Sequence, residues 1–106
     1  MQPFAALSDP TRRRIVEMLA AGERSAGEIV AEFDVSPPAI SQHLKVLREA
    51  ALVRVRAEAQ RRIYALDPKG FAALDEWLAH VRRYWGPKLD ALERALAKDK
   101  ISRRRT

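Results

Sequence analysis

The sequence predicts a mainly α-helical domain with one small β-hairpin, and three observations support this prediction. Residues 10–50 contain three segments with apolar side chains at helical spacing, and each segment follows a residue that is typical of a helix N-cap. Residues 52–66 show strand-like alternation with a return strand. Residues 68–98 carry a long apolar seam. At 106 residues, the chain fits one domain with a modest core. We assign this domain to residues 1–98.

The charge balance favours a polyanionic partner. The chain has 20 Lys and Arg against 14 Asp and Glu, a formal net charge of +6, which points to nucleic acid first and an anionic membrane surface second. No cysteine is present, which excludes disulfides and thiolate metal sites. No apolar run approaches the roughly 18 residues of a membrane helix, and the first residues lack signal-peptide features. We therefore expect a cytoplasmic, nucleoid-associated protein with no membrane partner.

The first two helices are predicted from short signals. Phe4 and Leu7 suggest a short N-terminal helix. Asp9 followed by Pro10 is typical of an N-cap and a first helical position. We expect Gly22 to end this second helix. Its apolar side chains share one face: Ile15, Met18 and Leu19.

Two further short helices predict a helix-turn-helix. Ser25 and Glu28 match the capping box, which marks a helix start. Residues 34–35 form a short turn, and Ser36 caps the next helix. Two short helices joined by a few residues are the helix-turn-helix pattern. The first of these two helices has an apolar side formed by Ile29, Val30 and Phe33.

Two prolines begin the second of these helices. Pro37 and Pro38 occupy positions where backbone N–H groups have no partner inside the helix, so proline loses no hydrogen bond there. Ser36 can then accept a hydrogen bond from the N–H of Ala39. The fixed φ of proline sharpens the turn and sets the angle of the helix.

The faces of helix 36–50 differ in chemistry. On a helical wheel the core side holds Ile40, Leu44, Leu47 and Ala51, and the opposite side holds Pro38, Ser41, Gln42, Lys45 and Arg48. Hydroxyls and amides read base edges, and Lys and Arg reach phosphates or guanine. The alternative is an ordinary solvated face. His43 lies on the flank of the core side. We expect it to pack at the surface or to form a local hydrogen bond; a contact with phosphate is the second choice, and a role as metal ligand is the third.

Residues 52–66 predict a basic hairpin. Leu52, Val53 and Val55 alternate with arginines, and residues 62–66 form the return strand. The segment has a net charge of +3 from Arg54, Arg56, Arg61 and Arg62 against Glu58. A helix-turn-helix followed by such a hairpin is a winged helix, whose wing lies along the minor groove. A basic hairpin without that role is the alternative.

The last segment predicts a dimerisation helix. Its apolar spacing is close to a coiled-coil repeat, with a kink or break expected at Gly86-Pro87. We expect a homodimer through this helix and the N-terminal one, although packing within one chain remains the alternative. The interface residues would be Phe4, Leu7, Leu78, Val81, Trp85, Leu89, Leu92 and Leu96. Residues 99–106 are expected to form a disordered basic tail, which either adds phosphate contacts or has no role.

With these motifs in place, the sequence resembles the ArsR/SmtB-type bacterial repressors. The resemblance covers about residues 4–98 and rests on LSDPTRRRIVEML, the capped helix from Ser25, VSPPAISQHLKVLREAALV and RRIYAL. It implies winged-helix homodimers that release operator DNA on sensing a signal. It also implies that Ser41, Gln42 and His43 approach DNA, with the wing arginines outside. The DNA-binding residues expected from pattern and resemblance are Ser36, Pro38, Ser41, Gln42, His43, Lys45, Arg48, Arg54, Arg56, Arg61 and Arg62.

Some positions depart from the family pattern. The helix before the recognition helix lacks the cysteines of arsenic and cadmium sensors, and the last helix has one His and no paired zinc-ligand set. We therefore expect no metal and no cofactor, and an inducer, if one exists, that is an unknown small molecule or protein. Pro37 replaces a frequent Gln. The tip at residues 59–60 lacks Gly, which predicts a longer or more mobile tip. Ala51 replaces a frequent Gly, which predicts a helix end without a left-handed cap.

The leading function is sequence-specific repression by a dimer whose recognition helices enter successive major grooves, ~34 Å apart, on a near-palindromic operator. The alternative is a winged-helix module that binds protein or coats DNA without sequence preference. No nucleophile–base pair, phosphate-cradling glycine loop or metal cluster is visible, so we do not expect an enzyme.

Overall fold

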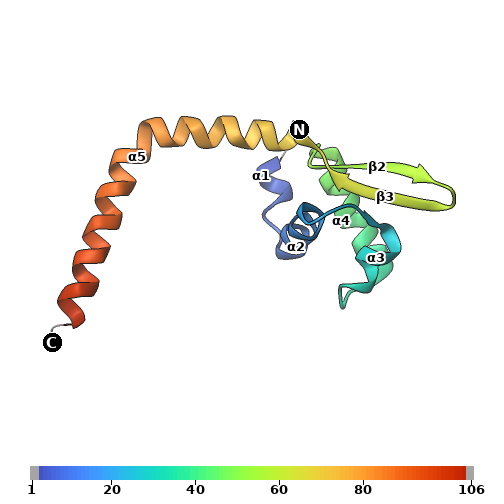
Figure 1. The fold of residues 1–106 in the computed structure, drawn as a ribbon, viewed down its shortest axis with the longest axis horizontal. Coiled ribbons are helices and arrows are strands. Elements are labelled where there is room, and N and C mark those ends of the chain that lie inside the picture. The colour runs from blue at the N-terminus through green and yellow to red at the C-terminus, as the bar shows by residue number, and fades with distance from the viewer. Residues whose placement is uncertain (1–2, 105–106) are drawn as a thin grey trace. The chain divides into compact units, whose positions relative to one another are not determined.

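The computed structural model describes the backbone of residues 3–104 and the side chains of residues 3–100. Its elements are α1 (Pro3–Ala6), α2 (Pro10–Ala20), β1 (Arg24–Ser25), α3 (Ala26–Ala31), α4 (Pro37–Glu49), β2 (Val53–Glu58), β3 (Arg61–Leu66) and α5 (Pro68–Arg104) (Figure 1). The predicted helices and hairpin are confirmed. The chain divides into two compact units, Met1–Leu74 and Asp75–Thr106, which are described separately.

Capping side chains begin three helices as predicted. The Asp9 carboxylate accepts hydrogen bonds from the N–H groups of Thr11 and Arg12, at 2.8 and 3.1 Å. Ser25 and Glu28 form a complete capping box at α3. The Ser36 hydroxyl accepts from the N–H of Ala39 at 3.3 Å. These groups satisfy donors that have no partner inside their helices, so the helix starts are fixed by local chemistry.

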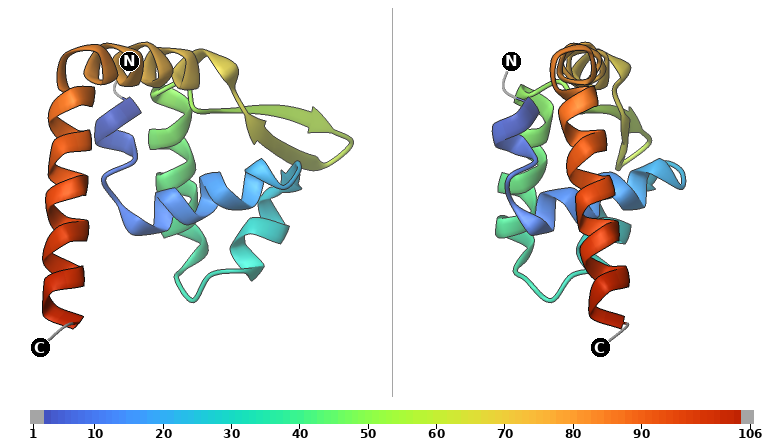
Figure 2. Two further views of the ribbon diagram at one scale, coloured as in Figure 1. Left: turned by 60° about the vertical axis from the view of Figure 1, so that its left-hand side comes forward. Right: turned by 90° about the vertical axis from the view of Figure 1, so that its left-hand side faces the viewer.

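The first unit is built around one apolar core. Ile15, Ile29 and Ile40 come from α2, α3 and α4 and are completely buried. Leu47 and Leu52 are also completely buried, on either side of the end of α4. Figure 2 shows the helices of this unit grouped together, with the β2–β3 hairpin extending away from them. The core therefore holds α4 by its apolar side and leaves its other side outward.

The sheet has one strand more than the sequence predicts. Its three antiparallel strands have the order β1-β3-β2, and Val53 pairs with Leu66 at one end of the hairpin and Glu58 with Arg61 at the other. The two-residue β1 pairs Ser25 with Ile63. A strand of this length carries no alternation of its own, because its place is set by pairing with a segment far along the chain.

The prediction of a longer wing tip is wrong, whereas its alternative, a more mobile tip, stays a prediction. Glu58 and Arg61 are paired, so residues 59–60 form a two-residue loop. Ala59 has φ +56°, and besides glycines only Ala51 shares a positive φ among the described residues. A positive φ at the first loop position alone matches a type II′ rather than a type I′ turn.

The prediction that α4 ends without a left-handed cap is also wrong. Ala51 has φ +58°. Its N–H donates to the Arg48 carbonyl, and the N–H of Leu52 donates to the Leu47 carbonyl, each at 3.0 Å. These two bonds define a Schellman motif, which satisfies carbonyls left free at the end of a helix. Leu47 and Leu52 are both fully buried beside it, so apolar burial supports the turn.

The helix α5 is continuous, with Pro87 inside it. The sequence predicts a kink or a break there, and the helix does not break. In Figure 1 the ribbon changes direction in its orange part, within residues 80–90. The helix also continues past residue 98 to Arg104, so the expected disordered tail is helical over residues 99–104, and residues 105–106 lie outside the described ones. Helix-favouring residues run on without a breaker, which explains the continuation.

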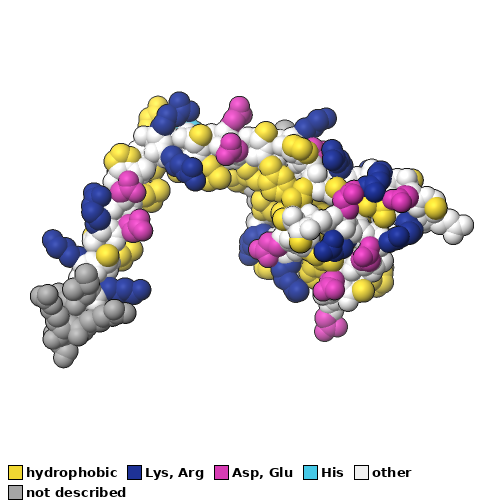
Figure 3. All heavy atoms as spheres, viewed as in Figure 1, with side chains coloured by type: hydrophobic (Ala, Val, Ile, Leu, Met, Phe, Trp, Pro, Cys, Tyr) yellow, Lys and Arg dark blue, Asp and Glu magenta, His cyan; other side chains and the backbone are white. Residues whose placement is uncertain are grey.

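The side chains of α5 differ in burial along the helix. Phe71 and Leu74 pack partly against the core, while seven large hydrophobic residues are exposed: Trp77, Leu78, Tyr84, Trp85, Leu89, Leu92 and Leu96. Figure 3 shows such hydrophobic side chains spread along the helix. Within residues 3–104 no helix is both long and apolar enough to span a bilayer. The described side chains also include no group of three or more His, Cys, Asp or Glu placed to hold a metal ion.

Candidate nucleic-acid interface

The exposed side of α4 carries a set of polar and basic side chains without partners. Ile40, Leu44 and Leu47 are buried on its core side. The residues that the sequence assigns to the other side are all exposed: Pro38, Ser41, Gln42, Lys45 and Arg48. The capping residue Ser36 is exposed as well. Lys45 and Arg48, with Glu49, line a shallow surface hollow. Within the described residues, the side chains of Ser41, Gln42, Lys45 and Arg48 form no hydrogen bond or ion pair, so all four are available to a ligand.

His43 lies differently from its neighbours. It is half-buried, and its Nδ1 lies 3.2 Å from Nη1 of Arg12 on α2. This agrees with the expected packing on the flank of α4, but the hydrogen bond is not local, because Arg12 lies 31 positions away on another helix. The sequence reasoning missed the contact between Arg12 and His43. The only hint in the sequence is weak, because Arg12 is followed by two further arginines, which are exposed. The Asp9 carboxyl has a lowered pKa, chiefly because the N–H of Arg12 donates to it, with smaller effects from the N–H of Thr11 and from the charge of Arg12.

Strand register divides the wing arginines between two faces. Arg54 is opposite Ala65 and Arg56 is opposite Ile63, so both arginines share one face of the hairpin, and Arg61 lies there too, opposite Glu58. Arg62 lies on the other face, opposite Ala57. All four arginines are exposed. The wing therefore presents cations on both faces.

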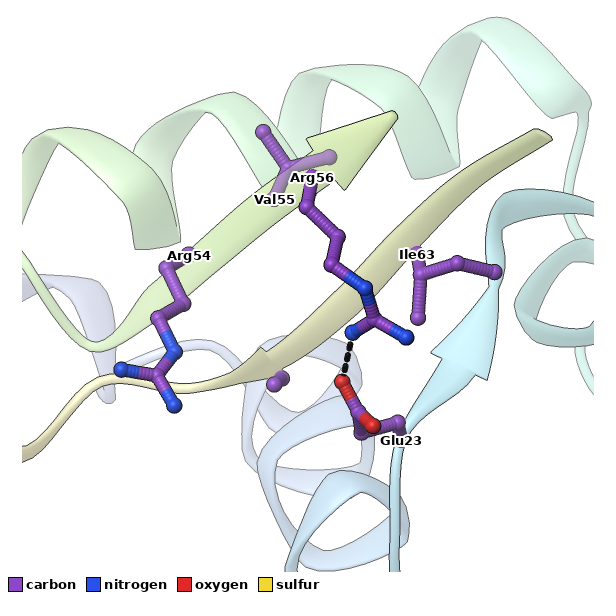
Figure 4. A pocket seen from close by; sticks show the side chains of 6 residues that line it. Glu23, Arg54, Val55, Arg56 and Ile63 are labelled. Atoms are coloured by element: carbon purple, nitrogen blue, oxygen red, sulfur yellow. Dashed lines mark hydrogen bonds and ion pairs between the residues drawn. The ribbon is translucent and has the colours of Figure 1, made fainter. Parts of the chain in front are cut away.

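Two of the wing arginines are paired with carboxylates. Arg56 donates to Glu23, in the loop before β1, and to Glu58 at 3.1 Å. Arg61 donates to Glu28 at 3.2 Å. Figure 4 shows Arg56 reaching toward Glu23 while Arg54 extends away from Glu23; both arginines line one surface hollow together with Ile63. Figure 3 shows basic and acidic side chains interspersed over the hairpin. Sequence reasoning missed both pairings: it did not single out Glu23, and it assigned Glu28 only to the capping box.

These pairs affect the ionisation of their members. The pKa of Arg56 is raised, first because the Glu23 carboxylate accepts its hydrogen bond. The pKa of Glu28 is lowered, first by the N–H of Ser25 in the capping box, with a smaller effect of Arg61. All of these side chains are more than half exposed, and exposed ion pairs contribute little stability. Arg54 and Arg62 form no ion pair among the described residues, so they are the most available cations of the wing.

The residues predicted to form the dimer interface, on α1, α5 and the segment after α1, differ in how far they are exposed. Phe4 on α1 is 48% exposed, whereas Leu7 packs partly against the core. On α5, Val81 is half-buried, and the remaining five predicted dimerisation residues are exposed. The residues predicted to bind DNA and most of those predicted to form the dimer interface therefore lie on different elements.

Comparison with known proteins identifies the family. The profile described as "Bacterial regulatory protein, arsR family" matches residues 9–55. The HTH-type transcriptional regulator Rv2034 of Mycobacterium tuberculosis is 51% identical over 82 residues, which cover 77% of this chain and 74% of that protein. The transcriptional repressor SdpR of Bacillus subtilis is 41% identical, over 60% of this chain and 71% of that protein.

A solved structure extends the similarity over most of the fold. The crystal structure of a possible transcriptional regulator for arsenical resistance is 40% identical and superposes with a TM-score of 0.72. The superposition covers 92% of this chain and 96% of that one. This match confirms the winged helix-turn-helix with its long C-terminal helix. The chain therefore belongs to the arsR family of bacterial regulatory proteins, which are DNA-binding transcriptional regulators and not enzymes.

Proposed function

We propose that this regulator is a homodimeric repressor that reads a near-palindromic operator with α4 and the wing. The observation that carries the proposal is the exposed side of α4, where two hydrogen-bonding side chains and two cations have no partner in the described protein. The name of SdpR, a transcriptional repressor, supports repression as the outcome. Such a protein would work in the cytoplasm, at the nucleoid.

The residues of α4 divide into two roles. Ser41 and Gln42 supply a hydroxyl and an amide for base edges in the major groove. Lys45 and Arg48 supply charges for phosphates, or for guanine. Ser36 and Pro38 form the tip of the helix. Pro37 and Pro38 have no N–H to offer a phosphate, so recognition depends on side chains and the remaining N–H groups.

The wing supplies the second contact. Arg54 and Arg62 can reach DNA without giving up a partner. Arg56 and Arg61 must exchange a carboxylate for a phosphate, which is feasible because their ion pairs are exposed. The narrow minor groove of an A·T-rich stretch attracts such arginines.

Dimerisation sets the length of the operator. A second copy covering the exposed apolar residues of α5 would bring two α4 helices to one duplex. Their centres would then enter the major groove about one helical turn apart, ~34 Å.

The test is fluorescence anisotropy of the purified protein across a salt series. One duplex carries a site selected from a random library, and the other carries a scrambled version of that site. We expect the selected site to bind about 10³-fold more tightly or better, within the range of specific binders. Near-equal affinities that both collapse with salt would mean that only phosphate contacts operate, and the repressor proposal would fail.

Two variants separate the roles on α4. Gln42→Ala is expected to lose about 1–3 kcal/mol of discrimination between the two duplexes. Lys45→Ala is expected to weaken both duplexes about equally and to reduce the salt slope by about one. An unchanged preference in Gln42→Ala would contradict direct reading by that amide.

A further inference from the structure

The Arg12 side chain connects three helices of the first unit. It extends from α2, and its Nε donates to the Ala6 carbonyl at 2.6 Å, while Nη2 lies 3.5 Å from the Ala5 carbonyl. Both carbonyls belong to α1. The remaining Nη1 lies 3.2 Å from Nδ1 of His43 on α4. The guanidinium is therefore fixed on one side by α1 and contacts the recognition helix on the other.

This contact determines the tautomer of the His43 ring. A guanidinium carries only N–H donors and has no acceptor. Nδ1 of His43 must therefore accept, and the ring proton lies on Nε2. The bond to Arg12 is the only side-chain hydrogen bond of His43 among the described residues. No fully buried side-chain nitrogen of the described residues lacks a partner, so the unpartnered Nε2 is not fully buried.

We propose that Arg12 is a positioning residue for DNA binding: it orients the His43 ring and fixes its tautomer so that Nε2–H donates to a DNA phosphate. The inference rests on the proposed function, because it assigns a further contact to the same helix. His43 lies on the flank of α4 next to Gln42, and the flank of a helix in the major groove faces the sugar-phosphate backbone. A donor that is already oriented loses little entropy when it binds.

A purely structural role for Arg12 is the competing explanation, and Arg13 offers a matched control. Arg13 Nη1 donates to the carbonyls of Leu7 and Ser8, at 3.0 and 3.3 Å. It therefore fastens the segment between α1 and α2 in the same way, but none of its hydrogen bonds reaches α4. Arg12→Lys and Arg13→Lys both keep the charge, so neither changes the general attraction to DNA.

Anisotropy on the selected duplex then separates the two explanations. We expect Arg12→Lys to bind about fivefold more weakly, the scale of one hydrogen bond, and Arg13→Lys to stay within about twofold of the wild type. His43→Asn keeps an acceptor near Arg12 but has no donor at the Nε2 position, and we expect the same loss. The double variant Arg12→Lys/His43→Asn should be no weaker than the weaker single variant, because both changes remove one contact.

Nitrogen-15 NMR of the imidazole supplies a readout that does not involve DNA. The free wild-type protein should show the Nε2–H tautomer of His43, and Arg12→Lys should show a mixture of tautomers. If the wild type does not prefer the selected duplex, the proposed function fails. If the wild type does prefer it, then wild-type affinity in Arg12→Lys, additive losses in the double variant, or the Nδ1–H tautomer in the wild type would each overturn the positioning role. If Arg12→Lys does not fold, the DNA affinity of His43→Asn and the tautomer seen in the wild-type spectrum still test the positioning role.

Discussion

At the scale of single residues, two alanines adopt a backbone conformation that usually belongs to glycine. Ala51 and Ala59 have φ values of +58° and +56°, and a left-handed conformation costs roughly 1–2 kcal/mol for a residue with a Cβ. At Ala51 the surroundings compensate. Leu52 is fully buried, and the Ala51 carbonyl accepts the N–H of Gly70 at 2.8 Å. An added Cβ on Gly70 would lie 2.5 Å from that carbonyl oxygen, so glycine is needed at the facing position.

Ala51→Gly should therefore stabilise the protein by about 1 kcal/mol, because glycine removes the steric cost of a positive φ. The neighbouring Ala50→Gly is the control: Ala50 is buried with φ −84°, so the same substitution there should destabilise by about 1 kcal/mol. Urea unfolding followed by circular dichroism measures both. Destabilisation by Ala51→Gly would contradict the left-handed turn.

These positions also show what sequence could and could not predict about residues. The caps at Asp9, Ser25 and Ser36 were predictable, because a cap and its N–H partner lie two or three positions apart. The turn at Ala51 was not, because part of what holds it comes from another element: the N–H of Gly70 donates to the Ala51 carbonyl. At both Ala51 and Ala59, the absence of glycine therefore led to a wrong prediction about the backbone conformation.

At the scale of elements, the wing combines a basic strand pair with carboxylates from elsewhere in the fold. The positive charge was predictable from the arginines of residues 52–66. The ion pairs Arg56–Glu23 and Arg61–Glu28 were not, since each joins residues 33 positions apart. Each of these carboxylates competes with DNA phosphate for the same guanidinium. The affinity of the hairpin for DNA is therefore lower than its net charge alone would suggest.

Glu23→Gln should therefore increase the affinity for all duplexes by about two- to fourfold at low salt, the scale of an exposed ion pair. The increase should shrink at high salt, where exposed charges are screened. Glu17→Gln changes the net charge equally, and Glu17 is exposed without an ion pair among the described residues. Anisotropy of both variants on the scrambled duplex is the measurement. If both variants gained affinity equally, the net charge alone would explain the effect, and the ion pair with Glu23 would not hold Arg56 back from DNA.

At the scale of the whole molecule, α5 carries a series of large hydrophobic side chains that are exposed. The long apolar seam was predictable from its spacing, whereas the continuity of the helix through Pro87 was not. Proline removes one hydrogen bond and displaces the preceding turn, and neighbouring turns can absorb both effects as a bend. Leu89, Leu92 and Leu96 are each at least half exposed. Burying a leucine completely contributes about 1.5–3 kcal/mol, so pairing this seam with a second copy would be strongly favourable.

Leu92→Asp should therefore convert the proposed dimer to a monomer at micromolar concentration, measured by sedimentation equilibrium. Ala97→Asp introduces the same charge away from the seam, on the side of α5 that carries Arg94 and Lys98, and should remain dimeric. Affinity of Leu92→Asp for the full operator should fall by about 10²-fold or more, because linked half-sites bind with a high effective concentration. Its affinity for a single half-site should stay unchanged, since α4 and the wing belong to the other unit. A monomeric wild type, or a Leu92→Asp variant that stays dimeric, would contradict dimerisation through α5. A loss of half-site affinity would instead show that α5 supports the recognition helix directly.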